Sequence, residues 1–312
     1  MARGRPGSAR VTFIFPRDPR RALSPLSSPS VTVPAPRGDA ALTSATAWYD
    51  SPLYYDMVYA DYTPAETRFI TGICRRHAGT GSRPLRVLEP ACGSGRLLES
   101  LSRRGHVVHG FDLNRNQVAF ARARLRRKGL KGKVWIDSMD RFRLPAGRPY
   151  DVAHCFVSTF KYLTSEAAAK RALRLMAAAV RPGGLVLLGL HLTDYRDRRE
   201  GYERWIGRRG GLKVISHTWS FLPDRRRRIE GMKTRMKIVR GGDVRVEDTV
   251  WDFRTYSPTE LRRLIAQAPD LELVACHDFH YDLGSTRSID LSYSDIVVVL
   301  RRREPTAGRR QR

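Results

Sequence analysis

Residues 88–97, LEPACGSGRL, join a carboxylate to a glycine-rich loop directly after an apolar run. Small residues let the backbone of such a loop approach a ligand closely. A triphosphate-binding loop needs a lysine and a serine or threonine after its last glycine, but Arg96 and Leu97 follow Gly95. A dinucleotide-binding loop needs a third glycine, and Leu98 holds that position. The residues therefore match neither phosphate-binding motif in full.

Glu89, at the end of the apolar run, favours a cationic ligand. Its carboxylate would repel a pyrophosphate at this loop and would attract an ammonium or a sulfonium group. S-adenosylmethionine carries both cations, and its carboxylate can meet the free amides of the helix that follows the loop. Asp112 lies 17 positions after Gly95, where an acidic side chain can accept the two hydroxyls of a ribose, in a dinucleotide as well. Glu89 and the missing third glycine favour S-adenosylmethionine.

The segments around these residues alternate between short apolar runs and helical patterns from residue 85 onward. This alternation predicts a parallel sheet with helices on both faces, in which ligands bind at the carboxyl ends of the strands. Asn114 is a suitable N-cap for the second helix. We expect strands over 85–90, 106–112, 133–137, 150–157 and 185–192, and helices from the glycine loop to Arg104, over 114–128 and over 164–180, the last ended by RPGG at 181–184.

Residues 193–256 interrupt the alternation with period-two patterns, which predict an antiparallel insertion after the fifth strand. A helix with a capping box of Ser257 and Glu260 follows, and then two more strands. The predicted fold is α/β, with a Rossmann-like, doubly wound, mostly parallel seven-stranded sheet and an antiparallel β insertion. The period-two segments are 211–221, 228–240 and 244–256, the helix is 257–267, and the last strands are 271–279 and 294–302.

The two ends of the chain do not follow this pattern. Residues 1–40 are rich in arginine, proline and serine and are expected to form a disordered basic leader. Residues 303–312 are expected to form a basic tail. One domain is predicted over 41–302, and its residues 48–80, aromatic and then helical, are interpreted as an N-terminal lid.

The composition narrows the class of protein. The formal net charge is +26, which raises the possibility of a nucleic-acid partner, although a generally basic surface explains it as well. No apolar run approaches the roughly 20 residues that span a bilayer. The four cysteines are scattered, without the spacing of a metal site. We expect a cytoplasmic protein without a bound metal and with no membrane contact.

Residues 85–192 resemble the class I S-adenosylmethionine-dependent methyltransferases, with weaker similarity over 48–78 and 257–300. VLEPACGSG is similar to the first motif of the family, with Ala91 in place of its first glycine, and GFDLN is similar to the second. The resemblance implies that S-adenosylmethionine is the cofactor. It also implies that the following residues bind it: Glu89, Ala91, Cys92, Gly93, Gly95, Asp112 and Leu113.

The third motif departs from the family pattern. Many relatives carry Asp-Met after the third strand, where the aspartate binds the adenine amino group, but this chain has Ser138 before Met139 and acidic residues at 137 and 140. The resemblance therefore places adenine near Asp137, Ser138 and Met139 without selecting one side chain. Phe156 and Ser158 fall where the sulfur end of the cofactor is expected.

Catalytic residues are harder to predict, because the protein has mainly to align an acceptor behind the methyl group. His191, at the end of the fifth strand, is placed for a general base, and a structural hydrogen bond explains it equally well. Tyr54 and Tyr59 belong, with Tyr49 and Tyr55, to a tyrosine-rich N-terminal segment. This segment resembles the lid of small-molecule N-methyltransferases.

Three functions remain open from the sequence. The first is methylation of a small molecule at an amine or hydroxyl. The second is methylation of RNA or another nucleic acid, which the net charge favours. Against it, residues 154–160 lack the Asn/Asp-Pro-Pro-aromatic signature of exocyclic-amine enzymes, and no Pro-Cys nucleophile occurs. The third is a module that binds S-adenosylmethionine without catalysis. The oligomeric state does not follow from the sequence.

Overall fold

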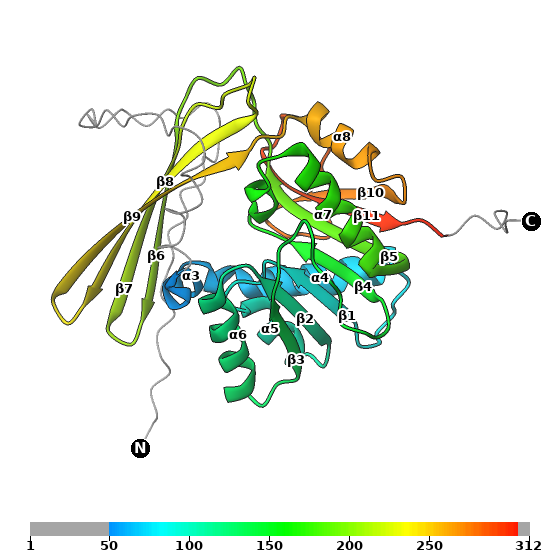
Figure 1. The fold of residues 1–312 in the computed structure, drawn as a ribbon, viewed down its shortest axis with the longest axis horizontal. Coiled ribbons are helices and arrows are strands. Elements are labelled where there is room, and N and C mark those ends of the chain that lie inside the picture. Colours follow the sequence, from blue (N-terminus) through cyan, green and yellow to red (C-terminus); the bar gives the residue numbers. More distant parts are fainter. Residues whose placement is uncertain (1–49, 305–312) are drawn as a thin grey trace, which may run out of the picture. The chain divides into compact units, whose positions relative to one another are not determined.

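The computed structural model describes residues 50–304, and they build the predicted α/β architecture (Figure 1). The leader at 1–40, Tyr49 and most of the predicted tail lie outside the described residues. None of the helices within 50–304 combines the length and apolar character that a membrane crossing requires.

A seven-stranded sheet forms the centre of the fold, in the order β10-β11-β5-β4-β1-β2-β3. All neighbours pair in parallel except β11, which is antiparallel to both β5 and β10. This confirms the predicted mostly parallel sheet. The strands are β1 Arg86–Pro90, β2 Val107–Asp112, β3 Gly132–Ile136, β4 Tyr150–Cys155, β5 Val180–His191, β10 Leu271–Asp278 and β11 Asp295–Arg302.

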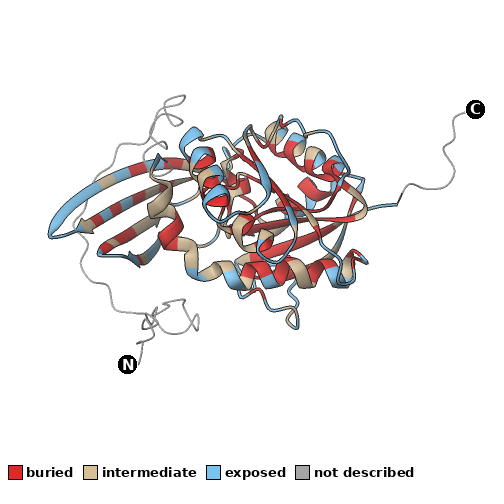
Figure 2. Ribbon diagram, turned by 90° about the horizontal axis from the view of Figure 1, so that it is seen from below, coloured by how far each residue is buried: buried red, intermediate tan, exposed pale blue. Residues whose placement is uncertain are grey.

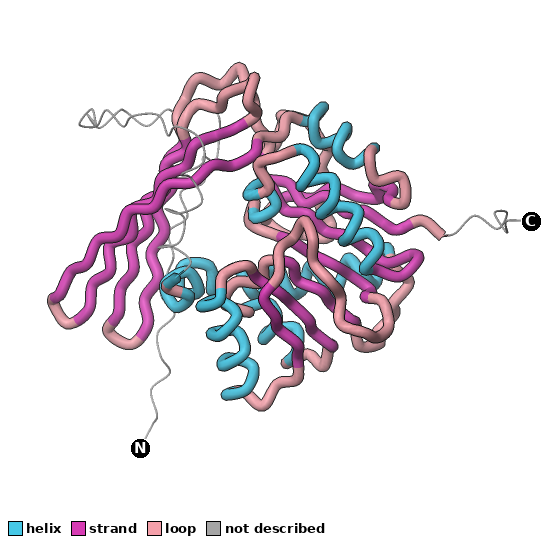
Figure 3. The backbone as a smooth tube through the Cα atoms, in the orientation of Figure 1, coloured by secondary structure: helices cyan, strands magenta, loops and turns pink. Residues whose placement is uncertain are grey.

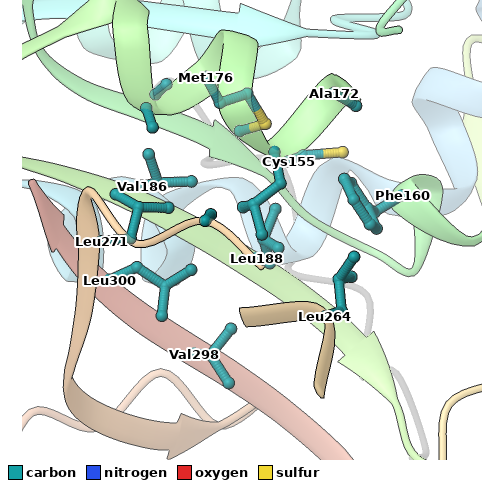
Figure 4. Packing of buried hydrophobic residues seen from close by; sticks show 14 of the residues in the cluster. Cys155, Phe160, Ala172, Met176, Val186, Leu188, Leu264, Leu271, Val298 and Leu300 are labelled. Atoms are coloured by element: carbon teal, nitrogen blue, oxygen red, sulfur yellow. The ribbon is translucent and has the colours of Figure 1, made fainter. Parts of the chain in front are cut away.

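Helices cover both faces of this sheet, and its strands are the most buried part of the fold (Figure 2). Alternate strand residues point to opposite faces, so Leu88 packs in one apolar cluster and Val87 in the other. Side chains of α7 and α8 complete the first cluster (Figure 4), and those of α4, α5 and α6 complete the second. The helices are α4 Thr63–His77, α5 Arg96–Ser102, α6 Arg115–Arg127, α7 Glu166–Ala179 and α8 Pro258–Ala266.

The helix starts follow the predicted capping chemistry. The Asn114 side chain accepts hydrogen bonds from the backbone of Asn116 and Gln117, and Ser257 and Glu260 form the complete capping box. One boundary was predicted wrongly, because β5 begins at Val180 and includes the RPGG segment. Val180 pairs with Tyr150, and a register shift follows before Leu185 pairs with Val152.

The insertion is a four-stranded antiparallel sheet in the order β6-β7-β8-β9, which lies beside the central sheet (Figure 3). Sequence patterns identified three of its strands and missed β6, because both faces of β6 carry charges. Glu203 and Arg209 point inward toward polar partners, and Arg204 and Arg208 point outward. The strands are β6 Gly201–Arg209, β7 Leu212–Ser220, β8 Ile229–Arg240 and β9 Asp243–Arg254.

Helix α3, Pro52–Tyr59, packs against strands β6 and β7 of the insertion (Figure 3). Gly207 permits this contact, since a β-carbon at this position would lie 2.7 Å from the backbone oxygen of Met57. A short 3-10 helix, η1 Ala60–Tyr62, joins α3 to α4. The segment interpreted as a lid is therefore helical and contacts the insertion.

His154 in β4 makes stability depend on pH. Its ring is fully buried, and neither ring nitrogen has a hydrogen-bond partner among the described residues. Burial, with a smaller effect of the Arg96 charge, lowers its pKa to about 3. Below the unfolded-state pKa of about 6.5, protons therefore bind the unfolded chain and not the native one, and this destabilises the native state.

We expect wild type to lose about 2 kcal/mol of unfolding free energy between pH 7 and pH 5 relative to a His154→Leu variant. Urea unfolding of both proteins at the two pH values measures this difference. An equal pH dependence in the two proteins would show that the His154 ring is protonated or hydrated in the native state.

Candidate functional site

The glycine loop after β1 turns sharply at the carboxyl edge of the central sheet. Ala91, Gly93 and Gly95 all have left-handed φ angles, of 53°, 52° and 72°. Alanine at the first of these positions tolerates a conformation that glycine adopts more readily. The Cys92 amide donates to the Phe111 carbonyl at 2.9 Å, which holds the loop against β2.

The close packing of helix on strand that the third glycine of a dinucleotide motif permits is achieved here by a different residue. Leu98 fills the space between α5 and β2, and the glycine lies instead at position 110 of β2. A β-carbon on Gly110 would lie 2.9 Å from both Leu98 Cδ1 and Cys92 Cβ. The helix and strand therefore approach closely by means of a glycine on the partner strand.

Glu89 lies on the wall of a pocket formed by this loop. Its side chain is buried, and Oε2 has no hydrogen-bond partner among the described residues. Burial raises its pKa well above the ordinary value, and the charge of Arg96 opposes this effect only in part. An ionised Glu89 therefore lacks a close cation, and a positively charged ligand in the pocket would supply one.

The pocket gathers several of the predicted cofactor residues. Ala91, Cys92, Gly93 and Phe156 line it together with Glu89. Gly95 does not line it, but its conformation starts α5 beside Ala121, whose Cβ would lie 2.9 Å from a β-carbon at Gly95.

Sequence reasoning missed Arg96 as a residue of this pocket. Its guanidinium pairs with the buried Glu66 of α4, with one contact of 2.9 Å, and also donates to Thr63 Oγ1. The charge of Glu66 helps to raise the Arg96 pKa against the cost of burial. The pocket therefore has a carboxylate on one wall and a fixed guanidinium on another, which suits a zwitterionic amino acid head.

Asp112 ends β2 next to this pocket. Its two carboxylate oxygens accept hydrogen bonds from the Gly93 amide at 2.8 Å and the Asn114 amide at 2.9 Å. Burial raises its pKa, although these backbone amides oppose the shift. Leu113 and Ile136 follow at the ends of β2 and β3, and their side chains are exposed, which gives a flat apolar ring a surface.

The polar side chains of the segment after β3 form hydrogen bonds with groups in or next to this segment. Asp137 accepts from Ser138 N, Trp135 Nε1 and Arg143 N. Ser138 Oγ lies 2.7 Å from Asp140, and Met139 is buried with its sulfur 3.8 Å from Cys155 Sγ. The backbone of this loop is therefore fixed.

Asp56 in α3 connects the lid to the glycine loop. Its buried carboxylate accepts from Ser94 Oγ at 2.9 Å, Arg124 of α6 at 2.6 Å and Arg209 of β6 at 3.0 Å. Burial alone would raise its pKa, but the hydrogen bond and charge of Arg124 outweigh this and lower it. A single carboxylate thus joins α3, α6, β6 and the loop.

A second polar cluster surrounds His191 at the end of β5. His191 Nδ1 lies 3.0 Å from Ser158 Oγ, and Nε2 contacts both Lys161 Nζ and Glu230 Oε2 of β8, the latter at 3.2 Å. Lys161 is fully buried and pairs with Glu230 at 3.1 Å. The structure thus brings the predicted His191 together with a lysine and a glutamate that the sequence did not indicate.

Two further carboxylates approach this cluster. The side chain of Glu203 in β6 reaches solvent, but the protein around it displaces much of the water near its carboxylate. This partial desolvation raises the pKa of Glu203. Burial likewise raises the pKa of Asp295 at the start of β11, which is opposed by the charges of His191 and Lys161. Trp205 Nε1 donates to Glu203 at 3.1 Å. With Glu230, three carboxylates from three separate elements thus lie around His191, and Glu230 forms the ion pair with Lys161.

The predicted tyrosines are divided between two places. The Tyr59 ring lies 4.7 Å from Tyr55, which lines the glycine-loop pocket, and 6.0 Å from Trp205. Tyr54 instead lies in a separate surface pocket beside Arg245, at the other end of the insertion. The structure therefore places Tyr59 between the two polar regions and Tyr54 away from both.

Comparison with known proteins supports the resemblance seen in the glycine loop. Residues 87–184 match the family model described as a methyltransferase domain. A ubiquinone biosynthesis O-methyltransferase of Aeromonas salmonicida is 30% identical over 103 residues, or 33% of this chain and 42% of that protein. The dTDP-3-amino-3,6-dideoxy-alpha-D-glucopyranose N,N-dimethyltransferase of Streptomyces fradiae is 29% identical over 138 residues, or 43% of this chain and 50% of that protein.

The chain thus spans about half the length of the curated relatives it matches. Among solved structures, the sugar N-methyltransferase KedS8 from a Streptoalloteichus species superposes with a TM-score of 0.59 at 19% identity. The match covers 91% of this chain and 100% of that structure. At this identity, the likeness shows a shared fold that extends beyond the region of the family model.

Proposed function

We propose, since the chain belongs to the class I S-adenosylmethionine-dependent methyltransferase family, that it transfers a methyl group from S-adenosylmethionine to an amine of a small molecule. The observation that carries the amine is the group of carboxylates beside the glycine-loop pocket. Glu230 pairs there with Lys161, and Glu203 and Asp295 lie near the same cluster without an ion pair among the described residues.

The residues around the glycine loop fit this cofactor. The unpartnered Oε2 of buried Glu89 is suited to the α-ammonium group, and Arg96, which lines the same pocket, is suited to the carboxylate. Asp112 is placed for the ribose hydroxyls, and the exposed Leu113 and Ile136 suit the adenine ring. When bound, the cofactor supplies an electrophilic methyl group on a sulfonium.

The chain's own residues would then bind and orient the acceptor. Glu203 and Asp295 favour a cationic amine, because two desolvated carboxylates gain from a nearby positive charge. The aromatic rings of Tyr59 and Trp205 add faces that attract cations and exclude water. His191 or Ser158 would hold the proton that the amine must lose before it can attack.

The relatives support an amino sugar as the acceptor. One curated relative is an N,N-dimethyltransferase of a nucleotide-linked amino sugar, and a solved structure with this fold is a sugar N-methyltransferase. A phenolic hydroxyl is the alternative that the O-methyltransferase relative suggests. Excess carboxylate favours the amine over the phenol, since a phenolate would be repelled.

Methyl transfer from labelled S-adenosylmethionine to separate pools of amino sugars, phenols and RNA tests this proposal. We expect methylated amines, with kcat/KM about 10- to 100-fold lower in Glu203→Gln, from the roughly 1.5–3 kcal/mol of one charge-assisted hydrogen bond. Glu200→Gln is the matched control, since Glu200 is exposed in the loop before β6. Methylation of phenols or RNA alone would refute the amine proposal.

A further inference from the structure

Lys161 has no exposed surface, although lysine is among the side chains least often buried. It belongs to η2, Thr159–Tyr162, the short 3-10 helix that follows β4. A methionine of similar size would fill this space without a desolvated charge, and an apolar residue often replaces a buried ion pair without loss of stability. The amine of Lys161 is therefore a candidate for a chemical role.

The groups around Lys161 come from every element packed against it. Glu230 of β8 lies 3.1 Å from Nζ, His191 of β5 forms a hydrogen bond with it, and the Phe253 ring of β9 lies 5.2 Å away. Asp295 of β11 acts through its charge, and Glu203 of β6 faces His191. The Lys161 amine, the His191 imidazole and the Glu230 carboxylate are therefore in mutual contact.

Ser158 connects the pair of His191 and Lys161 to the glycine-loop pocket. Its Oγ accepts from the His191 amide at 3.2 Å and lies 3.0 Å from His191 Nδ1, which leaves one lone pair free. Its neighbours Val157 and Thr159 both line that pocket. Val157 and Ser158 have φ angles of 54° and 58°, and such strain at a β-branched residue is typical of functional turns.

We propose that Ser158, His191 and Lys161 form a proton relay in which Lys161 stores the proton released by the methyl acceptor; this rests on the proposed amine methylation. The acceptor N–H bond breaks, and its electron pair stays on nitrogen. The proton binds Ser158 Oγ while the hydroxyl proton moves to His191 Nδ1 and the Nε2 proton moves to the lone pair of Lys161 Nζ. The Glu230 carboxylate balances the new ammonium, which returns its proton between turnovers to His191, whose partly exposed ring passes it to solvent.

The charges are consistent with this direction of transfer. Burial lowers the pKa of Lys161 to about 8, although Glu230 opposes the shift. Burial would raise the pKa of Glu230, but the hydrogen bond of His191 and the charge of Lys161 lower it to about 2. The amine form of Lys161 thus becomes available as pH rises through about 8, while Glu230 stays ionised.

The first test follows Lys161 itself in the full-length protein. Nuclear magnetic resonance of lysine labelled with carbon-13 at Cε, assigned with Lys161→Met, gives its titration midpoint. We expect one lysine near pH 8, with a lower midpoint in Glu230→Gln because the stabilising carboxylate is lost. Titration of Lys161 together with the surface lysines near pH 10.5 would overturn the relay.

The second test uses methyl transfer to the amine found in the acceptor screen. The wild-type rate is expected to rise through pH 8, and Lys161→Met to lose this rise with kcat about 100-fold lower, as for loss of a general base. Lys161→Arg is the matched control, because arginine keeps the ion pair but stays protonated. Thermal unfolding, cofactor binding and a Lys161→Met/Glu230→Gln variant check that the fold is retained.

The outcomes separate the two proposals. A structural lysine would be rescued by arginine, with the wild-type pH profile restored, and this result would overturn the relay. An arginine variant that stays as slow as the methionine variant would support it. Absence of any methylated amine would refute the proposed function, while the lysine titration would still decide whether Lys161, His191 and Glu230 are coupled.

Discussion

Replacement of Asp112 by alanine is expected to weaken binding of S-adenosylmethionine by about 100-fold or more. Two ribose hydroxyls would each lose a hydrogen bond to a carboxylate, at about 1.5–3 kcal/mol per bond. The Gly93 and Asn114 amides would lose their acceptor as well, so the glycine loop would be held less firmly. Isothermal titration calorimetry with wild type and variant measures the change.

Glu89→Gln is the matched comparison, because Glu89 is proposed to bind the other end of the same ligand. We expect this variant to weaken binding of S-adenosylmethionine and to leave binding of 5′-methylthioadenosine nearly unchanged, since that molecule has no amino acid head. Asp112→Ala should weaken both ligands. Equal affinity of wild type and Asp112→Ala for either ligand would contradict the assignment of the ribose site.

The second large effect is expected at Asp56, whose replacement by alanine should lower the unfolding free energy by about 3–5 kcal/mol. Removal of one partner from a buried ion pair leaves the other charge without compensation. Arg124 would keep its hydrogen bonds to Ser94 and a single longer ion contact, of 3.3 Å, with Glu99, and Arg209 would lose its carboxylate. Urea unfolding monitored by far-ultraviolet circular dichroism measures the loss.

Two further variants show whether the effect comes from the buried network. Asp194→Ala breaks an exposed pair with Arg196 and should change stability little. Asp56→Leu combined with Arg124→Met removes both charges and should recover part of the loss. A loss in Asp56→Ala as small as that in Asp194→Ala would mean that α3 is held by apolar packing alone.

The placement of Glu89 and Asp112 at one edge of the sheet could be predicted from sequence, because both lie at the ends of consecutive strands. Glu89 ends the apolar run of β1, and Asp112 ends that of β2, so parallel pairing of the two strands brings them to one edge. The glycine loop between them is local, and its φ angles are largely a property of its own residues. Short-range patterns therefore predicted both the sheet and the loop.

The errors arose where tertiary contacts replace the usual pattern. Strand β6 was missed because charged residues on its inward face, such as Arg209, contact buried polar groups such as Asp56. The absent third glycine looked like a departure in the loop, and only the structure shows that Gly110 on β2 supplies the space. Tyr54 and Tyr59 looked equivalent in sequence, but five positions along a helix point them in different directions.

The sequence alone thus determined the fold class, the glycine loop and the two carboxylates suited to a cationic, ribose-bearing cofactor. The tertiary structure alone decided what surrounds His191. Lys161, Glu203, Glu230 and Asp295 come from four elements far apart in the chain. Their charges come together only when the insertion folds beside the central sheet. A local sequence pattern does not predict contacts between residues so far apart in the chain.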